Sequence, residues 1–304
     1  MGRLLPNFLM IGVPRSGSTW LYTVLREHPE IYLSPSLKES HFFSGAADVT
    51  VRDLQAVNIS YRLTNDMDKY QQLFAGAEGF PLRGEIDPSI LGCARYAIPK
   101  IRELIGECQF LIVLRQPAER AYSHYLLHAR FYGEPHRFEY YLNINTPRDA
   151  YERIALHRYF RCSYYYEDVK LFFDAFGRRA FCVLLYDDLA DADAFLQTIL
   201  QFLHAAPFAL PDLSERINAG IVPAGVLAPL RRPQHPLRQF ARRYLPTSWR
   251  KQLRSAWQRN RAASGGWSKP PLAPAIRQAL TERYREDILK LQDLIQRDLG
   301  HWLV

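Results

Sequence analysis

Residues 8–20 read FLMIGVPRSGSTW, and this stretch decides the fold. An apolar run of strand length leads into a glycine-rich turn, after which residues suited to a helix begin. Gly12 and Gly17 have the G-x-x-x-x-G spacing of a phosphate-binding loop. A loop that hydrolyses nucleotides has lysine next, but this chain has Ser18, and the nearest cation is Arg15 inside the loop. The stretch therefore predicts a strand, a loop and a helix that bind phosphate without the usual lysine.

The same loop offers several hydrogen-bond donors to an anion. Its backbone N–H groups and the positive N-terminal end of the following helix would face the ligand. Three hydroxyl side chains add donors, and Arg15 adds a fixed positive charge. The predicted cradle consists of Arg15, Ser16, Gly17, Ser18 and Thr19. The alternative is an ordinary glycine-rich turn between a strand and a helix.

Strand-length apolar runs alternate with helical patterns along the rest of the chain. Two of the runs, FLIVLR and FCVLLY, are continuous, as in strands that are buried on both faces of a parallel sheet. The alternation implies right-handed crossovers, so we predict the α/β class, as a P-loop-like three-layer α/β/α sandwich with a central parallel sheet. The expected strands are 8–12, 31–33, 110–115 and 181–186, and the expected helices are 18–27, 118–131, 164–176, 191–203 and a last one from Leu280 to Trp302.

A second candidate phosphate site lies in LIVLRQPAERAYSHY, residues 111–125. Arg115 ends a buried strand, at the edge where open α/β sheets bind their ligands. Ser123 follows in the next helix, and a guanidinium with a hydroxyl suits a phosphate group. Two phosphate sites on one sheet edge imply a ligand with two separated anionic groups. The alternative is a structural ion pair between Arg115 and Glu119.

The net charge of +8 is unevenly distributed. Thirteen Arg or Lys and no Asp or Glu lie between Arg216 and Arg277, whereas the rest of the chain carries 26 basic and 31 acidic residues, a net of −5. Such asymmetry favours an anionic ligand or surface. We expect a single domain over 1–304, with an insertion at about 44–83 and a basic, proline-containing helical segment at about 216–277.

The four cysteines, Cys93, Cys108, Cys162 and Cys182, form no C-x-x-C pair. We therefore expect reduced, buried thiols and no metal site. No apolar run reaches 18 residues, and the N-terminus lacks the pattern of a signal peptide. We expect a cytoplasmic protein, with a peripheral position at a membrane surface as the alternative.

The two phosphate-binding stretches together resemble a known enzyme family. PRSGSTWL followed by LRQPAERAYSHY looks like the sulfotransferases that use 3′-phosphoadenosine-5′-phosphosulfate (PAPS), and most like the heparan sulfate type and its bacterial relatives. In that family the first loop holds the 5′-phosphosulfate, and the R-x-P-x-x-R-x-x-S-x-Y stretch holds the 3′-phosphate. Further landmarks are ESHFF (39–43), GEIDPSIL (84–91), SYYYEDVKLFFDAF (163–176), LLYDDL (184–189) and the last helix.

The resemblance implies a role for each matching residue. Residues 15–19 would cradle the 5′ side of PAPS, and Arg115 and Ser123 would take its 3′-phosphate. Trp20 stands where some members of the family stack the adenine, with a core tryptophan as the equal alternative. Tyr165 matches a tyrosine that lies near the nucleotide. The product would be adenosine 3′,5′-bisphosphate (PAP), and no metal would be needed.

The resemblance also places a general base in SLKESHFF. Sulfuryl transfer needs a base for the acceptor hydroxyl, in-line geometry and positive charge on the leaving phosphate. Glu39 matches the family's catalytic glutamate, His41 is the rival base or the group that orients it, and Lys38 would add charge. A solvated loop without a role is the alternative. Heparan-type relatives often have G-E-K-T-P where this chain has Ile86 and Asp87, so the lysine is missing and the acceptor class is open.

The acceptor and the basic segment leave several hypotheses open. Residues 238–257 interleave arginines with aromatic residues, which suits a lid, a grip for an anionic acceptor or a helix on a membrane surface. We expect a hydroxyl-bearing acceptor, with anionic and membrane-associated acceptors as alternatives, and no nucleic acid. The rival functions are a P-loop nucleotide kinase or NTPase, which would use the acids after FCVLLY to hold Mg²⁺, and a non-catalytic protein that binds a nucleotide or polyanion.

Overall fold

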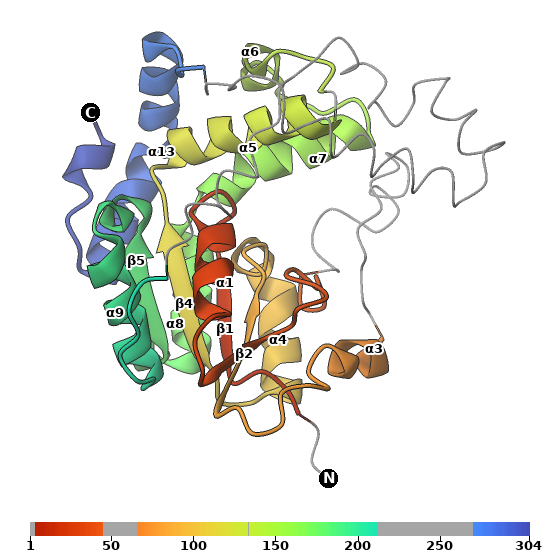
Figure 1. The fold of residues 1–304 in the computed structure, drawn as a ribbon. Coiled ribbons are helices and arrows are strands. Elements are labelled where there is room, and N and C mark those ends of the chain that lie inside the picture. Colours follow the sequence, from red (N-terminus) through yellow and green to blue (C-terminus); the bar gives the residue numbers. More distant parts are fainter. Residues whose placement is uncertain (1–3, 45–65, 133, 212–269) are drawn as a thin grey trace, which may run out of the picture.

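The computed structural model describes residues 4–44, 66–132, 134–211 and 270–304. Its centre is a five-stranded sheet in which all neighbouring strands run parallel, in the order β2-β3-β1-β4-β5 (Figure 1). The predicted parallel sheet is confirmed. The strands are β1 (Phe8–Gly12), β2 (Ile31–Leu33), β3 (Leu82–Ile86), β4 (Gln109–Leu114) and β5 (Phe181–Leu185).

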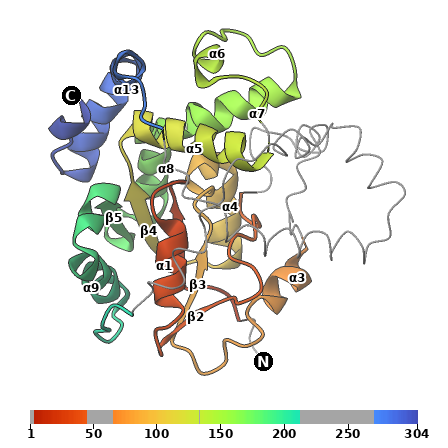
Figure 2. The same cartoon turned by 45° about the horizontal axis from the view of Figure 1, so that its top comes forward.

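Helices cover both faces of the sheet, which gives the predicted three layers (Figure 2). One face carries α1 (Ser18–Leu25) and α9 (Ala192–Leu203). The other face carries α4 (Ala94–Leu104), α5 (Pro117–Tyr132) and α8 (Tyr166–Phe176), and α13 (Pro274–Ile295) packs on α5 and α8. The shorter helices are α3 (Met67–Gln72), α6 (Phe138–Leu142) and α7 (Ala150–Tyr159), with 3-10 helices η1 (Leu91–Cys93), η2 (Arg161–Ser163), η3 (Arg178–Ala180), η4 (Tyr186–Ala190) and η7 (Gly300–Trp302).

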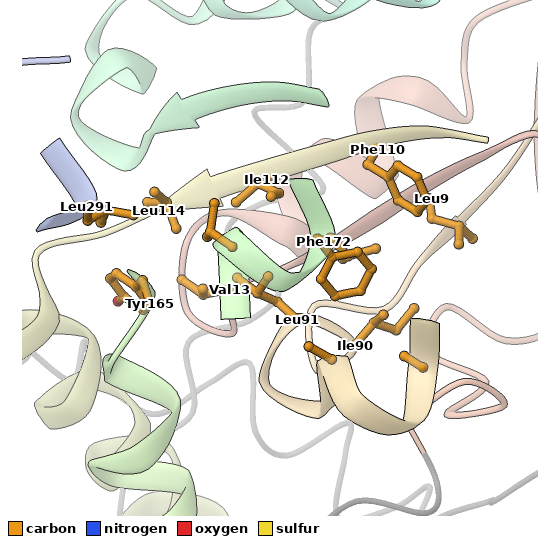
Figure 3. Close-up of a cluster of buried hydrophobic side chains, with 14 of the residues drawn as sticks. Leu9, Val13, Ile90, Leu91, Phe110, Ile112, Leu114, Tyr165, Phe172 and Leu291 are labelled. Carbon is orange, nitrogen blue, oxygen red and sulfur yellow. The ribbon is translucent and has the colours of Figure 1, made fainter. Parts of the chain in front are cut away.

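Alternate residues of β1 serve the two layers, as successive side chains of a strand must. Leu9 and Ile11 join the apolar cluster on the α4, α5 and α8 side, whereas Phe8 and Met10 join the cluster under α1 and α9. Figure 3 shows the first cluster, in which Phe172 of α8 packs against the sheet. Because β1 is buried on both faces, its carboxyl end is rigidly placed, and the loop that follows is rigidly placed with it.

Strand β3 is a correction to the sequence analysis, which assigned 44–83 to an insertion and recognised no strand after it. The strand begins at Leu82 and inserts between β2 and β1. Its sequence, LRGEI, has no apolar run, so it gives no hydrophobic signal. Gly84 is required there because a Cβ would lie 2.0 Å from the ring of Phe8 in the neighbouring strand. The missed strand places acidic residues next to the phosphate loop.

The other expected strands agree with the structure to within one residue at each end. The expected helices are also present, but the last one ends at Ile295, and η7 carries Trp302 after it. Helices α3, α4, α6 and α7 are additional to those expected.

The basic segment at about 216–277 lies mostly outside the described residues, as do residues 45–65 of the expected insertion. Nothing in the structure therefore bears on the three hypotheses for residues 238–257. Within the described ranges, no helix combines the length and the apolar character that crossing a membrane requires.

Candidate active site

A cavity of about 270 Å³ opens at the carboxyl ends of the strands. Its walls come from the loop after β1, the turns after β2 and β3, helices α5 and α7, and η2. Arg15, Ser18 and Thr19 line it from the loop, and Lys38 and Glu39 line it from the turn after β2. Open α/β sheets bind their ligands at this edge. The structure thus brings the predicted phosphate loop and the predicted base into one cavity.

The loop after β1 has a backbone shape suited to an anion. Arg15 and Gly17 have left-handed conformations, with φ of 77° and 86°. Glycine adopts this conformation freely, whereas arginine does so at a cost of roughly 1–3 kcal/mol, and such strain is found at functional sites. The Ser16 hydroxyl donates to the carbonyl of Val13, so this serine closes the loop. Helix α1 begins at Ser18, which points its positive end at the cavity.

Lys38 supplies an ammonium group where the loop itself has none. Its Nζ donates to Oγ of Ser18 over 3.2 Å and forms an ion pair with Glu39. Ser18 occupies the position of the missing loop lysine, so the Lys38 ammonium lies next to that position although Lys38 comes twenty residues later in the sequence. The same contact holds the turn after β2 against the phosphate loop.

The two predicted phosphate sites are joined by direct contacts. Arg15 Nε donates to Oγ of Ser123 over 3.2 Å, and Arg115 Nη1 donates to the backbone carbonyl of Arg15 over 2.7 Å. Partial burial of the Arg15 guanidinium, and then the charge of Arg115, lower the pKa of Arg15. An anion placed here would offset that repulsion. Glu119, the alternative partner of Arg115, forms an ion pair with Arg277 at 3.0 Å.

The acids that follow β5 contact the C-terminal part of the chain. Asp188 forms an ion pair with Arg297, and Asp187 accepts a hydrogen bond from Nε1 of Trp302 at 3.2 Å. These contacts give both carboxylates a structural role. In the part of the chain that the structure describes, no group of three or more His, Cys, Asp or Glu side chains is arranged to hold a metal ion.

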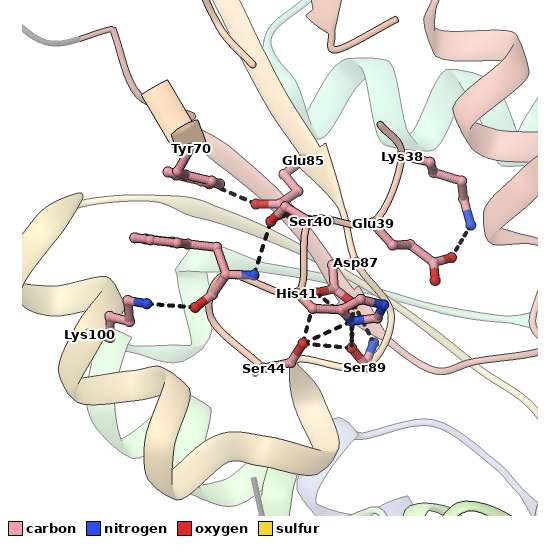
Figure 4. A network of polar contacts seen from close by, with 11 residues as sticks. Lys38, Glu39, Ser40, His41, Ser44, Tyr70, Glu85, Asp87, Ser89 and Lys100 are labelled. Carbon is pink, nitrogen blue, oxygen red and sulfur yellow. Dashed lines mark hydrogen bonds and ion pairs between the residues drawn. The ribbon is translucent and has the colours of Figure 1, made fainter. Parts of the chain in front are cut away.

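Buried Glu85 holds the turn that carries the candidate bases (Figure 4). One of its carboxylate oxygens accepts from the backbone N–H of Ser40 at 3.2 Å and from the Ser40 hydroxyl, and the other accepts from Oη of Tyr70 at 2.7 Å. Burial, and then the nearby charge of Asp87, raise the pKa of Glu85 from 4.5 to about 7. Because Ser40 lies between the two candidate bases in the sequence, Glu85 fixes the backbone of both.

His41 lines the cavity and contacts a second buried carboxylate (Figure 4). Its Nδ1 lies 3.1 Å from Oγ of Ser89, 3.2 Å from Oγ of Ser44 and 3.6 Å from Oδ2 of Asp87. Asp87 in turn accepts from the Ser44 hydroxyl at 2.9 Å, from the Ser89 N–H at 3.1 Å and from the Ser89 hydroxyl. The imidazole is therefore backed by a polar cluster of Asp87 and Ser89 from the turn after β3 and Ser44 from its own turn.

The two predicted aromatic contacts of the nucleotide have different surroundings. Trp20 is half-buried, packs edge-on against Phe195 with ring centroids 5.9 Å apart, and lies outside the lining of the cavity. This packing agrees with the structural alternative, and stacking on adenine stays a prediction. Tyr165 lines the cavity and donates from Oη to the backbone carbonyl of Arg115 at 2.8 Å. Burial raises its pKa, so the hydroxyl stays a donor that holds Arg115 in place.

Helix α5 carries buried basic side chains to which the sequence analysis assigned no role. Arg120 is fully buried and donates to Oγ of Ser163 and to the carbonyls of Arg158 and Tyr159, each at 2.7 Å. These bonds fasten α5 to α7 and η2 beneath the cavity. The sequence did contain a signal for Arg120, because this residue is the second arginine of the R-x-P-x-x-R pattern.

His124 and His128 lie one helical turn apart on α5 and line the cavity. Burial lowers the pKa of both imidazoles, that of His128 to about 3. They are therefore neutral near pH 7 and offer one donor and one acceptor each. Their i, i+4 spacing was visible in the sequence, but only the structure shows that this helix face meets the cavity.

Comparison with known proteins agrees with this geometry. A sequence model of the Sulfotransferase family matches residues 6–208. The bifunctional heparan sulfate N-deacetylase/N-sulfotransferase of Drosophila melanogaster is 32% identical over 147 residues, which cover 43% of this chain and 12% of that protein. Carbohydrate sulfotransferase 15 of Rattus norvegicus is 27% identical over 157 residues, which cover 42% of this chain and 28% of that protein. The chain thus spans only a small part of the length of these relatives.

Among solved structures, the sulfotransferase from Alicyclobacillus acidocaldarius is similar over almost its whole length. The TM-score is 0.68 at 23% sequence identity, with 98% of this chain and 99% of that chain covered. This likeness shows that the two chains share a fold.

Proposed function

The chain belongs to the sulfotransferase family, and we propose that it transfers the sulfuryl group of PAPS to a hydroxyl of an acceptor. The observation that carries the proposal is the joined pair of cationic sites, in which Arg15 contacts Ser123 directly and Arg115 through its carbonyl. A nucleotide with anionic groups on both its 5′ and 3′ sides needs two such sites at one sheet edge. Glu39 lines the same cavity, where an acceptor hydroxyl would meet the sulfate.

In this proposal the two sites divide the donor between them. Residues 15–19 and the N-terminus of α1 hold the 5′-phosphosulfate, and Arg115 with Ser123 holds the 3′-phosphate. Tyr165 supports Arg115 from the protein side. Trp20 is the proposed contact of the adenine ring. Bidentate guanidinium contacts and helix N-terminal N–H groups both favour phosphate-like oxygens.

Glu39 is the proposed general base. It accepts the proton of the acceptor hydroxyl while the oxygen attacks sulfur, so that a new O–S bond forms as the S–O bond to the 5′-phosphate breaks. PAP then leaves with an additional negative charge. Lys38, which contacts both Ser18 and Glu39, and Arg15 stabilise that charge. His41 is the alternative base, and the reaction as written uses no metal ion.

The acceptor is proposed as a glycan or another alcohol. One relative is named for heparan sulfate and another for carbohydrate, which favours glycans, including anionic ones. A membrane-associated lipid alcohol is the other class, since the basic segment suits either partner. We propose a cytoplasmic location, with a peripheral position at a membrane surface as the alternative, and no nucleic-acid partner.

Radiolabelled PAPS tests the function directly. The purified protein is incubated without magnesium with neutral glycans, acidic glycans, lipid alcohols and tyrosine peptides, and both label transfer and PAP release are measured. Transfer to one acceptor class, with one PAP released for each label transferred, is the expected result. Hydrolysis of ATP with magnesium, together with no PAPS-dependent PAP release for any acceptor, would contradict the proposal.

A further inference from the structure

One wall of the cavity is formed by α5 and α7. His124, Leu127 and His128 line the cavity from α5, and His157 and Arg158 line it from α7. Residues three and four positions apart share one face of a helix, so the three residues of α5 form a continuous strip. The sequence analysis gave this wall no role, and the reaction proposed above does not use it. Its side chains are therefore candidates for recognition of the acceptor molecule.

His124 shares the cavity with the proposed base and not with the proposed 3′-phosphate site. Glu39, Arg15 and His124 all line the cavity. Arg115 and Ser123 lie outside its lining. In the proposed function, the sulfate end of the donor therefore enters the cavity at Arg15, and the 3′-phosphate stays outside it. The volume between Glu39 and the α5 wall is left for the acceptor.

Arg120 determines which nitrogen of the His124 ring carries a hydrogen. Nη1 of Arg120 lies 3.2 Å from Nδ1 of His124. A guanidinium group only donates and stays charged, so Nδ1 must accept and carries the lone pair. Both atoms of this contact are nitrogens of fixed groups, so no rotatable hydroxyl enters the assignment. Arg120 is fully buried, and three further hydrogen bonds to η2 and α7 hold its guanidinium in this orientation.

The His124 ring is neutral, so its single N–H is at Nε2. Burial, and then the charge of His128, lower the pKa of His124 well below its usual value of 6.5. The ring also packs edge-on against Tyr159, with centroids 6.0 Å apart. The charged and titratable side chains that surround it are Arg15, Arg120, His128, Arg158 and Tyr159. Among the described residues, the bond with Arg120 is the one hydrogen bond of this ring, so the Nε2–H is left for a ligand in the cavity.

We propose that His124 binds the acceptor molecule by donating a hydrogen bond from Nε2–H to one of its oxygens, and that Arg120 is the positioning residue that holds the ring in this tautomer. The inference rests on the proposed function, which supplies the acceptor. His124 has no lone pair to offer the reacting hydroxyl, because Nδ1 is used by Arg120, so it recognises the acceptor and leaves the proton to Glu39 or His41. A fixed donor among basic neighbours selects an oxygen, above all an anionic one, and disfavours an ammonium group.

The tautomer is measured by long-range proton–nitrogen NMR of the histidine rings at about pH 8, where an ordinary imidazole is neutral, and at about pH 6, where it is mostly charged. His124→Phe identifies the His124 signals by their absence. The wild type is expected to show Nε2–H at both pH values, because burial and the basic neighbours keep the ring neutral. An Nδ1–H ring at pH 8, or a doubly protonated ring at pH 6, would overturn the proposal. If H124F does not fold, His124→Gln identifies the signals instead.

Kinetics test the contact with the acceptor, with whichever member of the glycan, lipid-alcohol and peptide panel takes label from PAPS. H124F is expected to raise KM for that acceptor about three- to tenfold, the effect of one lost hydrogen bond. It should leave kcat within about twofold, because the contact is made before and during the reaction alike. H124Q, whose amide can donate, should recover part of the loss, and stabilisation by PAP should stay unchanged in both variants.

His136→Gln is the matched control, because His136 is also half-buried and stacks on the ring of Tyr140 but lies outside the lining of the cavity. It should change neither KM nor kcat. An unchanged KM in H124F, or a loss of PAP stabilisation as large as the rise in KM, would contradict the proposal, and the second result would assign His124 to the donor site. Absence of all sulfuryl transfer would remove the proposed function and leave the tautomer result standing.

Discussion

The loop after β1 and the turn after β2 line the same cavity but are held in place by different means. The loop, residues 13–19, depends on its own backbone, with two left-handed residues and a helix start within five positions. The turn, residues 38–44, also has a left-handed residue, His41, but is held by two buried carboxyl groups, that of Glu85 in β3 and that of Asp87 just after it. The loop, as the first wall, presents the Arg15 guanidinium to the cavity, whereas the turn, as the second wall, is supported from behind by buried carboxyl groups.

The difference shows what each charge is for. The guanidinium of Arg15 lines the cavity, and the nearby charge of Arg115 lowers its pKa, so a donor bound as proposed would relieve this repulsion. The carboxyl groups of Glu85 and Asp87 are buried and bound to protein donors, so they hold the turn in position. Changes on the first wall should therefore alter donor binding, and changes on the second wall should alter turnover or stability.

The largest expected effect comes from Glu39→Gln. Loss of the general base should lower turnover by about 100- to 10,000-fold, while stabilisation by PAP persists because the donor wall is intact. Labelled transfer and thermal unfolding measure the two effects separately. Glu103→Gln, which changes an exposed carboxylate on α4, serves as the control. If E39Q keeps its turnover, the general base is another residue, and His41 is the first candidate.

Arg115→Ala should have the next largest effect, and this effect should be on the affinity for the nucleotide. Removal of a charge-assisted contact is expected to weaken the binding of PAP about ten- to hundredfold. The affinity for adenosine 5′-phosphate, which lacks the 3′-phosphate, should fall less. Arg115 affects this nucleotide only indirectly, because it donates a hydrogen bond to the carbonyl of Arg15. Titration calorimetry with both nucleotides measures the ratio, and Ser123→Ala should change it in the same direction by less. Equal losses for the two nucleotides would refute the assignment of Arg115 to the 3′-phosphate.

The last expected effect lies outside binding and turnover and concerns the pH dependence of stability at Glu85. Its pKa is raised from 4.5 to about 7 in the folded protein, so between these values the folded state binds more protons than the unfolded state. The free energy of unfolding should therefore fall as pH rises through this window, by at most about 1.4 kcal/mol per pH unit, and should level off above it. Glu85→Gln should remove this slope. Urea unfolding of both proteins from about pH 5 to 8 gives the comparison, and parallel curves would contradict the raised pKa.

The sequence could predict the first wall because its parts are contiguous. FLMIGVPRSGSTW and LRQPAERAYSHY each carry a strand end, a turn and donors in one run, so local patterns and family resemblance were sufficient. Their meeting through Arg15 and Ser123 followed from parallel strands that share an edge.

The second wall could not be predicted in the same way. Ser40 meets Glu85, and Ser44 meets Asp87, across more than forty residues, and the strand that joins them has no apolar pattern. In the sequence analysis, GEIDP (84–88) mattered only because it lacks the lysine of the heparan-type pattern. The sequence analysis expected Lys38 to add charge, but its contact with Ser18 became visible only in the structure.

Thermal unfolding with nucleotides tests the central claim, a site for two separated phosphates, most directly. A ligand at 100 times its dissociation constant adds about 2.7 kcal/mol of stability. We predict that PAP without magnesium stabilises the protein by this order, that adenosine 5′-phosphate does so less at the same concentration, and that ATP with or without magnesium has little effect. Stabilisation by ATP with magnesium that exceeds the effect of PAP would contradict the account.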